Sequence, residues 1–442
     1  LFNKSGFPML GGNFDVTDFT FNNILLGDLS LNNYSNEKND SLYSRGVIKN
    51  DIDILYFFAQ YPLDSSKNIN IDVLFEEFPI DVLDVFIQPV SQFEGLSTGK
   101  ININGPIDDY GLFGNTYVKK LKFSIPYLNN EYYNDQDSMK VTFNNDSILI
   151  SEFTFSDMNH NTIASSSGFI QHKNLKDMSY VLNISSDSLF TLNTDQVNNE
   201  NYFGRSFIAG DMVLEATPEE VTLNIDGISK DGSILMIPLS NSKEIIENKF
   251  LHFSEVDMES TRRPDVVTQK SKFNMNFNLD IGNSSEIQLI FDEEMGDLIK
   301  GYGQGDLFLK IDDNGSFQVF GDFIIEKGNY LFTLQDVITK SFEIEEGGTI
   351  KFNGNPYNAT IDLNLLYNVQ ASLNPLNADY DRKVKSPVIC KMKMTNNLLN
   401  PDIDFSIEIP KSDQIIETSL EMLTNTEQKL LEQFLYLLIA NS

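Results

Sequence analysis

The feature that most constrains this chain is an alternation of apolar and polar residues with a period of two. In the clearest segment, Phe273, Met275, Phe277, Leu279 and Ile281 alternate with asparagine and aspartate. The same alternation recurs at 307–311, 317–325, 361–365, 388–394 and 405–409. Because side chains alternate between the two faces of a strand, each segment predicts a strand with one apolar and one polar face. Many such strands favour a sandwich, a barrel or a solenoid.

The N-terminal half carries the same alternation less regularly. We expect strands at 100–104, 140–144, 147–155, 180–185, 212–215 and 221–226, separated by turn-forming residues. A helix is expected near 73–78. The clearest helix is terminal, at 424–440, where Thr424 precedes Glu427 at capping-box spacing and apolar residues follow at helical spacing.

Four segments are expected along the chain. Residues 1–94 and 95–247 are two β-rich groove segments, 248–270 is a linker or long loop, and 271–442 is a C-terminal β domain. Gly99, Gly210, Gly305 and Gly321 each stand before a short apolar stretch, so we interpret them as glycines that open strands. Such a recurrence is typical of sheets stacked along one axis.

Composition excludes several classes of function. The net charge of −32 argues against a nucleic acid partner, because phosphate binding needs dense Lys and Arg. The single cysteine, Cys390, excludes a disulfide framework, and on an apolar strand face it predicts a buried, inert thiol. No window reaches the roughly 20 apolar residues of a membrane-spanning helix. Because the sequence begins at Leu1, we expect a fragment or a processed chain.

No motif supports catalysis or a bound cofactor or metal. The glycine-rich stretch 301–305 precedes a strand rather than a helix, so it predicts a turn instead of a phosphate cradle. The stretch 312–315 resembles part of a calcium loop but lacks its later glutamate, and a hairpin turn is expected there. Three scattered histidines offer no ligand spacing. We therefore expect a protein that is not an enzyme.

Four stretches of the C-terminal third together resemble a known family. They are 321–332 (GDFIIEKGNYLF), 342–352 (FEIEEGGTIKF), 354–362 (GNPYNATID) and 400–405 (NPDIDF). This combination is similar to the C-terminal domain of the TamB family, a subunit of the translocation and assembly module. The resemblance runs from about 305 to 442 and more loosely from about 95.

The resemblance implies a fold, a location and partners. The fold would be an elongated, curved β-sheet groove, an open solenoid called a β-taco, with an apolar interior and short C-terminal helices. The location would be the periplasm of a double-membrane bacterium, with an inner-membrane anchor upstream and a TamA-like outer-membrane barrel as partner. Two activities are implied, phospholipid transport between the membranes and assistance to outer-membrane protein assembly.

The first hypothesis is a periplasmic bridge whose groove carries phospholipid acyl chains. Its alternative is that the same residues close a sealed sandwich core. The residues expected to line the groove are Phe273, Phe277, Leu307, Leu309, Phe317, Val319, Phe323, Ile350, Phe352, Ile361, Leu363, Leu365, Met392, Met394, Phe405 and Ile407.

The second hypothesis is an assembly factor that pairs a free strand edge with an outer-membrane protein. The terminal helix would then dock the TamA-like partner, or else merely cover the end of the sheet. The residues expected to dock are Leu430, Leu431, Phe434, Leu435 and Leu438. A third hypothesis, a transmembrane barrel, is disfavoured because the expected strands are short and lack aromatic girdles.

Overall fold

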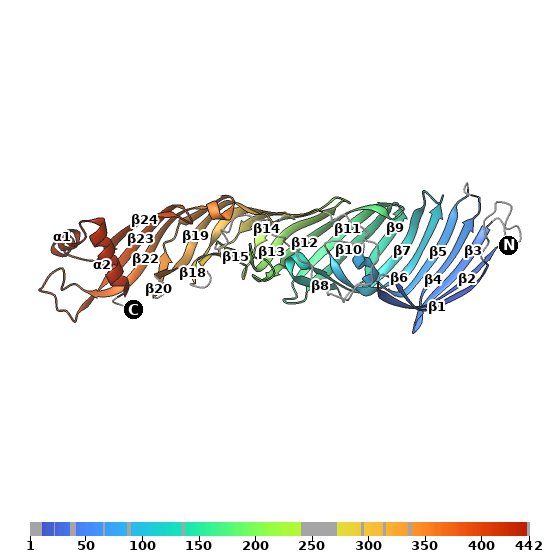
Figure 1. The fold of residues 1–442 in the computed structure, drawn as a ribbon, viewed down its shortest axis with the longest axis horizontal. Coiled ribbons are helices and arrows are strands. Elements are labelled where there is room, and N and C mark those ends of the chain that lie inside the picture. Colours follow the sequence, from blue (N-terminus) through green and yellow to red (C-terminus); the bar gives the residue numbers. More distant parts are fainter. Residues whose placement is uncertain are drawn as a thin grey trace, which may run out of the picture. The chain divides into compact units, whose positions relative to one another are not determined.

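A computed structural model of the chain describes residues 11–21, 23–35, 41–64, 67–85, 90–134, 138–239, 272–292, 296–312, 315–334 and 338–439. Within these residues, 24 strands belong to one sheet and two α-helices follow them (Figure 1). The prediction of an all-β fold with short C-terminal helices is confirmed. The linker expected at 248–270 lies outside the described residues.

Two compact units make up the described chain. Unit 1 contains the residues up to 191, together with 208–226 and 272–275, and unit 2 contains 192–207, 227–239 and 276–439. Strands β12, β13, β14 and β16 contribute residues to both units.

Unit 1 is a series of antiparallel strands with two short 3₁₀ helices. Most strands pair with the next one in sequence, but β8 and β9 lie end to end between β7 and β10. The elements are β1 (Gly12–Phe21), β2 (Ile24–Ser35), β3 (Ser41–Asn50), β4 (Ile52–Pro62), β5 (Ile69–Pro79), η1 (Asp81–Val85), β6 (Ser91–Gly105), β7 (Gly111–Ile125), η2 (Pro126–Leu128), β8 (Asn130–Asn134), β9 (Met139–Asn145), β10 (Ser147–Asp157), β11 (Ile163–Lys173), β12 (Lys176–Thr194), β13 (Phe203–Ala216), β14 (Glu220–Ser229) and β16 (Lys272–Ile281).

Unit 2 repeats this arrangement and adds the helices. Strands β20 and β21 lie end to end between β19 and β22, and β15 pairs with β17 in parallel. The elements are β15 (Ile234–Pro238), β17 (Glu286–Asp292), β18 (Asp297–Ile311), β19 (Phe317–Leu334), β20 (Ile338–Ile344), β21 (Gly348–Gly354), η3 (Pro356–Asn358), β22 (Thr360–Ser372), β23 (Lys385–Asn397), β24 (Pro401–Glu408), α1 (Gln414–Leu423) and α2 (Glu427–Ile439).

The helix expected at 73–78 was a wrong prediction, because these residues lie in strand β5. Ile69, Ile71 and Val73 form a β-branched series with period two, and they pair with Gly105, Ile103 and Ile101 of β6. Such residues fit a pleated surface better than a helix. The other expected strands are confirmed, although most are longer than expected; β12, for example, has 19 residues.

The glycine-rich stretch 301–305 lies inside β18 and is not the turn that we expected. Gly305 belongs there because a side chain at this position would put its Cβ 2.1 Å from the Asp322 carbonyl oxygen of β19. Gly321 on β19 has a φ of +115°, and a Cβ at this position would lie 2.1 Å from the Asp306 carbonyl oxygen. These two glycines do not begin strands, as we expected. They lie inside β18 and β19 and allow the two backbones to approach closely.

Two local predictions on turns and caps had different outcomes. The hairpin expected at 312–315 is confirmed from its two sides, since Ile311 pairs with Phe317 and the Gly315 N–H donates to the Asp312 carbonyl at 3.0 Å; residues 313–314 lie outside the described residues. Thr424, expected to begin the terminal helix, instead ends α1, and Thr426 accepts the Lys429 N–H at the start of α2. Thr424 and Glu427 therefore have the spacing of a capping box, but Thr424 does not cap the start of α2.

Candidate functional site

An uninterrupted row of apolar side chains and glycines crosses unit 1. Its members are cross-strand partners on successive strands, so they lie on one face of the sheet. This inner row of unit 1 covers eleven strands and consists of Phe14, Leu31, Gly46, Phe57, Val73, Ile101, Gly114, Phe143, Ile148, Ile170 and Tyr180. At a strand spacing of about 4.8 Å, ten steps correspond to roughly 48 Å of continuous apolar surface.

Much of this row is only half covered. Phe14 leaves 46% of its surface exposed, and Leu31, Phe57 and Val73 are half-buried. A contiguous, partly exposed apolar face is a candidate binding surface rather than a closed core.

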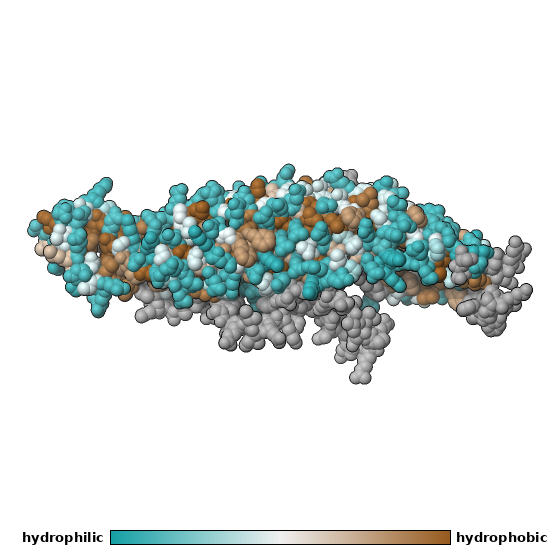
Figure 2. Space-filling view, turned by 90° about the horizontal axis from the view of Figure 1, so that it is seen from above, coloured by the Kyte–Doolittle hydropathy of each residue, from teal (hydrophilic) through white to brown (hydrophobic). Residues whose placement is uncertain are grey.

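The neighbouring row on the opposite face of the same strands is largely polar. It contains Asn32, Arg45, Phe58, Asp72, Asn102 and Phe113. Lys100 pairs with Asp72 at 2.9 Å, and this contact is the main reason that the pKa of Asp72 lies below its usual value. Figure 2 shows one face of the molecule on which hydrophilic residues predominate and hydrophobic ones form separate patches.

One side of the inner face in unit 1 is filled by aromatic side chains. Phe123 lies 5.4 Å from Tyr132 and 5.5 Å from Phe155, ring centre to ring centre. The Tyr132 hydroxyl and the Asn130 amide both donate to the Phe190 carbonyl oxygen, at 3.1 and 3.0 Å. Burial raises the pKa of Tyr132, so the phenol stays protonated and keeps donating.

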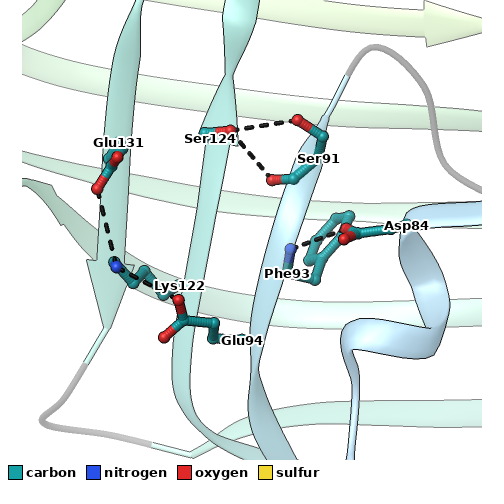
Figure 3. Close-up of polar contacts among 7 residues, drawn as sticks. All are labelled: Asp84, Ser91, Phe93, Glu94, Lys122, Ser124 and Glu131. Carbon is teal, nitrogen blue, oxygen red and sulfur yellow. Dashed lines mark hydrogen bonds and ion pairs between the residues drawn. The ribbon is translucent and has the colours of Figure 1, made fainter. Parts of the chain in front are cut away.

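Polar contacts hold the strands around this aromatic filling (Figure 3). Lys122 on β7 lies 3.4 Å from Glu94 on β6 and 3.8 Å from Glu131 on β8. The Asp84 carboxylate at η1 accepts the Phe93 N–H of β6 at 2.8 Å. These contacts join β6, β7, β8 and η1 on one side of unit 1.

Unit 2 has an inner row of the same kind. This inner row of unit 2 covers nine strands and consists of Gly204, Leu235, Ile287, Gly301, Gly328, Ile344, Leu365, Met392 and Phe405. The row one residue away is Gln288, Lys300, Asn329, Glu343, Leu366, Lys391 and Ser406, which is polar except for Leu366. Lys391 also pairs with Glu408 at 2.5 Å.

The inner row of unit 2 is covered far more completely than that of unit 1. Ile287, Ile344, Leu365 and Met392 are 0–4% exposed. Helix α2 contributes to this covering, because the Phe434 ring lies 6.3 Å from Phe342 and 4.7 Å from Phe405.

The sixteen residues expected to line a groove all lie on the apolar faces of their strands. Phe273 belongs to unit 1, where its ring stacks on Tyr127 at 4.0 Å, and the others belong to unit 2. Twelve are 0–6% exposed, namely Phe273, Leu307, Leu309, Val319, Phe323, Ile350, Phe352, Ile361, Leu363, Leu365, Met392 and Met394. The remaining four, Phe277, Phe317, Phe405 and Ile407, are half-buried. These twelve side chains are closed to solvent in this structure.

The five residues expected to dock a partner divide between two sides of α2. Phe434 and Leu438 are buried against the sheet, at 1% and 2% exposed. Leu430 and Leu435 are half-buried, and Leu431 is 38% exposed. Sequence reasoning missed Ile415, Met422 and Tyr436, which are 63–68% exposed on the two helices.

The described residues offer little reactive chemistry. Cys390 is fully buried, as predicted, and burial raises its pKa to about 12. Within the described ranges, no cluster of three or more His, Cys, Asp or Glu side chains is arranged to hold a metal ion. No helix in the described part of the chain is both long enough and apolar enough to span a membrane.

Sequence reasoning also missed most of the inner row of unit 1. Strand-to-strand register shifts at Val16/Phe19, Phe75/Phe78 and Ile150/Phe153 break the alternation there. Reading the period separately on each side of the Phe75/Phe78 bulge would have assigned Ile69, Ile71 and Val73 to one face of β5.

Comparison with known families gives a match over most of the chain. The family model described as the TamB C-terminal domain matches residues 153–441. No curated protein matches the chain.

Proposed function

This chain belongs to the TamB family, and from that premise we propose that it carries phospholipid acyl chains along its inner face between the inner and outer membranes. The family has its role in the translocation and assembly module, in the periplasm, with a TamA-type outer-membrane partner. The proposal adds the cargo and the surface that carries it. It also includes an inner-membrane anchor upstream of residue 1.

The single observation that carries the proposal is the pair of inner rows. Eleven strands of unit 1 and nine of unit 2 each contribute an apolar residue or a glycine, with no polar residue among them. A soluble cargo would not need such a surface, whereas an alkyl chain binds it without any directional contact.

The energetics of lipid transfer explain why a continuous surface helps. Exposing an acyl chain to water costs about 0.8 kcal/mol per methylene, or roughly 13 kcal/mol for a chain of about 16 carbons. A half-covered apolar row removes much of this cost while leaving the head group in water. No nucleotide is needed for such a path, and the direction of transfer would come from the membranes.

The two units have different roles in this proposal. The half-buried side chains of unit 1, such as Leu31 and Phe57, are available to an alkyl chain without rearrangement. The tightly covered row of unit 2 requires its walls to separate, and α2 with its Phe434 ring is the element that would have to move. Lipid is therefore expected to bind unit 1 first.

Photocrosslinking at two adjacent residues tests the proposal. A photoreactive phenylalanine analogue at Phe57 faces the inner row, and the same analogue at Phe58 faces the opposite side of the same strand. We expect phospholipid adducts at Phe57 and at least tenfold fewer at Phe58, because strand neighbours point to opposite faces. Equal labelling at the two positions, or none at Phe57, would show that the inner row does not carry lipid.

A second candidate function is assistance to outer-membrane protein assembly. It is favoured by strand β24, which pairs along one edge with β23 and has no partner along its other edge among the described residues. An unpaired edge is able to add a strand from a client protein. Proline at the centre of β24, as in Asp404→Pro, is expected to reduce client crosslinking and leave Phe57 lipid adducts unchanged. Loss of both signals, or of neither, would argue against this second function.

A further inference from the structure

Two turns of unit 1 are joined by hydrogen bonds although they belong to strands that are not neighbours. The turn between β6 and β7 contacts the turn between β11 and β12, and strands β9 and β10 lie between β7 and β11 in the sheet. The Asn174 side chain accepts the Tyr110 N–H at 3.2 Å and donates to the Asp108 carbonyl at 2.7 Å. The Tyr110 hydroxyl donates to the Asn174 carbonyl at 3.1 Å. Asp108, Tyr110 and Asn174 are named here the strap.

The strap crosses the β9–β10 hairpin on the side of the inner face. In a flat sheet, the three steps from β7 to β11 correspond to roughly 14 Å, so the two turns have to lean towards each other to form hydrogen bonds. His172 shows the side, because it alternates with Ile170 of the inner row on β11. Its Nδ1 accepts the Leu175 N–H at 3.4 Å, so the β11–β12 turn folds towards the inner face.

Inner-face side chains next to the strap are buried even at the ends of their strands. Leu112 is the first inner-face residue of β7 and His172 is the last of β11, yet they are only 4% and 5% exposed. Ile148, which lies in the inner row on β10, is 8% exposed, whereas Phe14 in the same row is 46% exposed. Burial at strand ends requires a cover beyond the strands themselves, and the strap lies where it can supply that cover.

Two features destabilise the closed strap. The His172 Nε2 atom is buried without a hydrogen-bond partner in the part of the chain that the structure describes. Asn174 and Leu175 have φ values of +53° and +58° and form a two-residue turn between Lys173 and Lys176. Such a turn prefers glycine at its second position, because a side chain is strained at positive φ. Three hydrogen bonds therefore act against two unfavourable features of similar size, which leaves the strap close to opening.

We propose that the strap is a gate over the inner row of unit 1. It is closed in this structure, and its opening uncovers the row on β9 to β11, so that an acyl chain can move there from the half-covered strands β1 to β5. The purpose of the gate rests on the proposed function, since only a cargo on the inner row has to pass it. The opening itself, which uncovers Ile148, is measurable without any lipid.

Thiol labelling at the covered part of the row tests the gate. The variant Ile148→Cys introduces a thiol there, and its rate of modification by a water-soluble maleimide measures how often the strap opens. Adding Asn174→Gly removes two of the three hydrogen bonds and tolerates the positive φ, so the rate should rise at least tenfold. Adding Leu175→Gly relieves the strained turn instead, so the rate should fall severalfold.

A matched control exists at the other end of β11. Asn161 has a φ of +57°, and its side chain accepts the Tyr133 hydroxyl at 3.0 Å, but it lies in the β10–β11 turn, outside the strap. Asn161→Gly should therefore leave the labelling rate at Ile148→Cys unchanged. Cys390, the single natural cysteine, lies in unit 2 and is labelled on a different peptide. Its rate should be the same in all variants, which shows that unit 2 is unaffected.

The gate is refuted by equal rates in Asn174→Gly and Asn161→Gly, by faster labelling in Leu175→Gly, or by rapid labelling of Ile148→Cys with the strap intact. Lipid adducts at Phe57, measured in the same variants, report on the proposed function separately. Absence of these adducts together with the tenfold rise would refute lipid transport and support the gate. Adducts at Phe57 with unchanged thiol rates would refute the gate alone.

Discussion

Truncation of one leucine in each inner row should have very different effects in the two units. Leu365 is fully buried between Ile344 and Met392, so Leu365→Ala leaves a cavity and should cost about 2–5 kcal/mol. Leu31 is half-buried. Full burial of a leucine contributes about 1.5–3 kcal/mol, so Leu31→Ala should cost about 1 kcal/mol.

The chain contains its own local reporter for this comparison. Cys390 is its single cysteine, lies two residues from Met392 on the same strand face, and is fully buried. The rate at which a thiol reagent modifies Cys390 under native conditions measures how often unit 2 opens. A loss of about 2 kcal/mol corresponds to an increase of roughly 30-fold for Leu365→Ala, whereas Leu31→Ala should change the rate fivefold at most. Equal increases in the two variants, or rapid modification of the wild type, would refute the difference in covering between the units.

Three further predictions concern single positions. Gly321→Ala should destabilise the fold by more than about 2 kcal/mol in urea unfolding, because its Cβ would lie 2.1 Å from a carbonyl oxygen. Gly347→Ala, with a φ of +91° and open space around it, should cost only about 1 kcal/mol, and the reverse order would contradict this. Burial raises the pKa of the Cys390 thiol to about 12, so the unfolded chain loses this proton at a lower pH than the folded chain does. The contribution of this group to the free energy of unfolding should be complete below about pH 8.5 and decline towards pH 12. A free energy of unfolding that stays constant over this range would show that the thiol is not buried. Lys100→Ala should raise the pKa of Asp72 measured by NMR, because it removes the cation that lowers it, and an unchanged pKa would count against the ion pair.

The period of two was enough to assign faces wherever strands run without interruption. Leu363 and Leu365 alternate with polar residues, and both lie on the inner side of β22, fully buried. The family motifs at 342–352 and 354–362 lie on β20 to β22. Strands β20 and β21 lie end to end there, and both pair with β22. The local pattern predicts which face of a strand a side chain occupies, because side chains alternate between the two faces along a regular strand.

Other features depend on parts of the chain that are far apart in sequence. Leu31 and Leu365 have similar alternating surroundings in the sequence, yet one is half-buried and the other fully buried. The difference arises from what covers each face, such as α2 with Phe434 over unit 2. Similarly, the contact of Tyr132 with Phe190 joins residues 58 positions apart, which no local period predicts.

Lipid analysis of the protein purified without detergent tests the central proposal most directly. Wild-type protein and a Phe57→Asp/Val73→Asp variant, which places two charges in the inner row of unit 1, would be extracted and their lipids identified by mass spectrometry. Circular dichroism would confirm that both are folded. We predict that the wild type contains phospholipid in near-stoichiometric amounts and that the variant contains at least tenfold less. Wild-type protein without phospholipid, or a folded variant that retains as much as the wild type, would contradict an inner face that carries acyl chains.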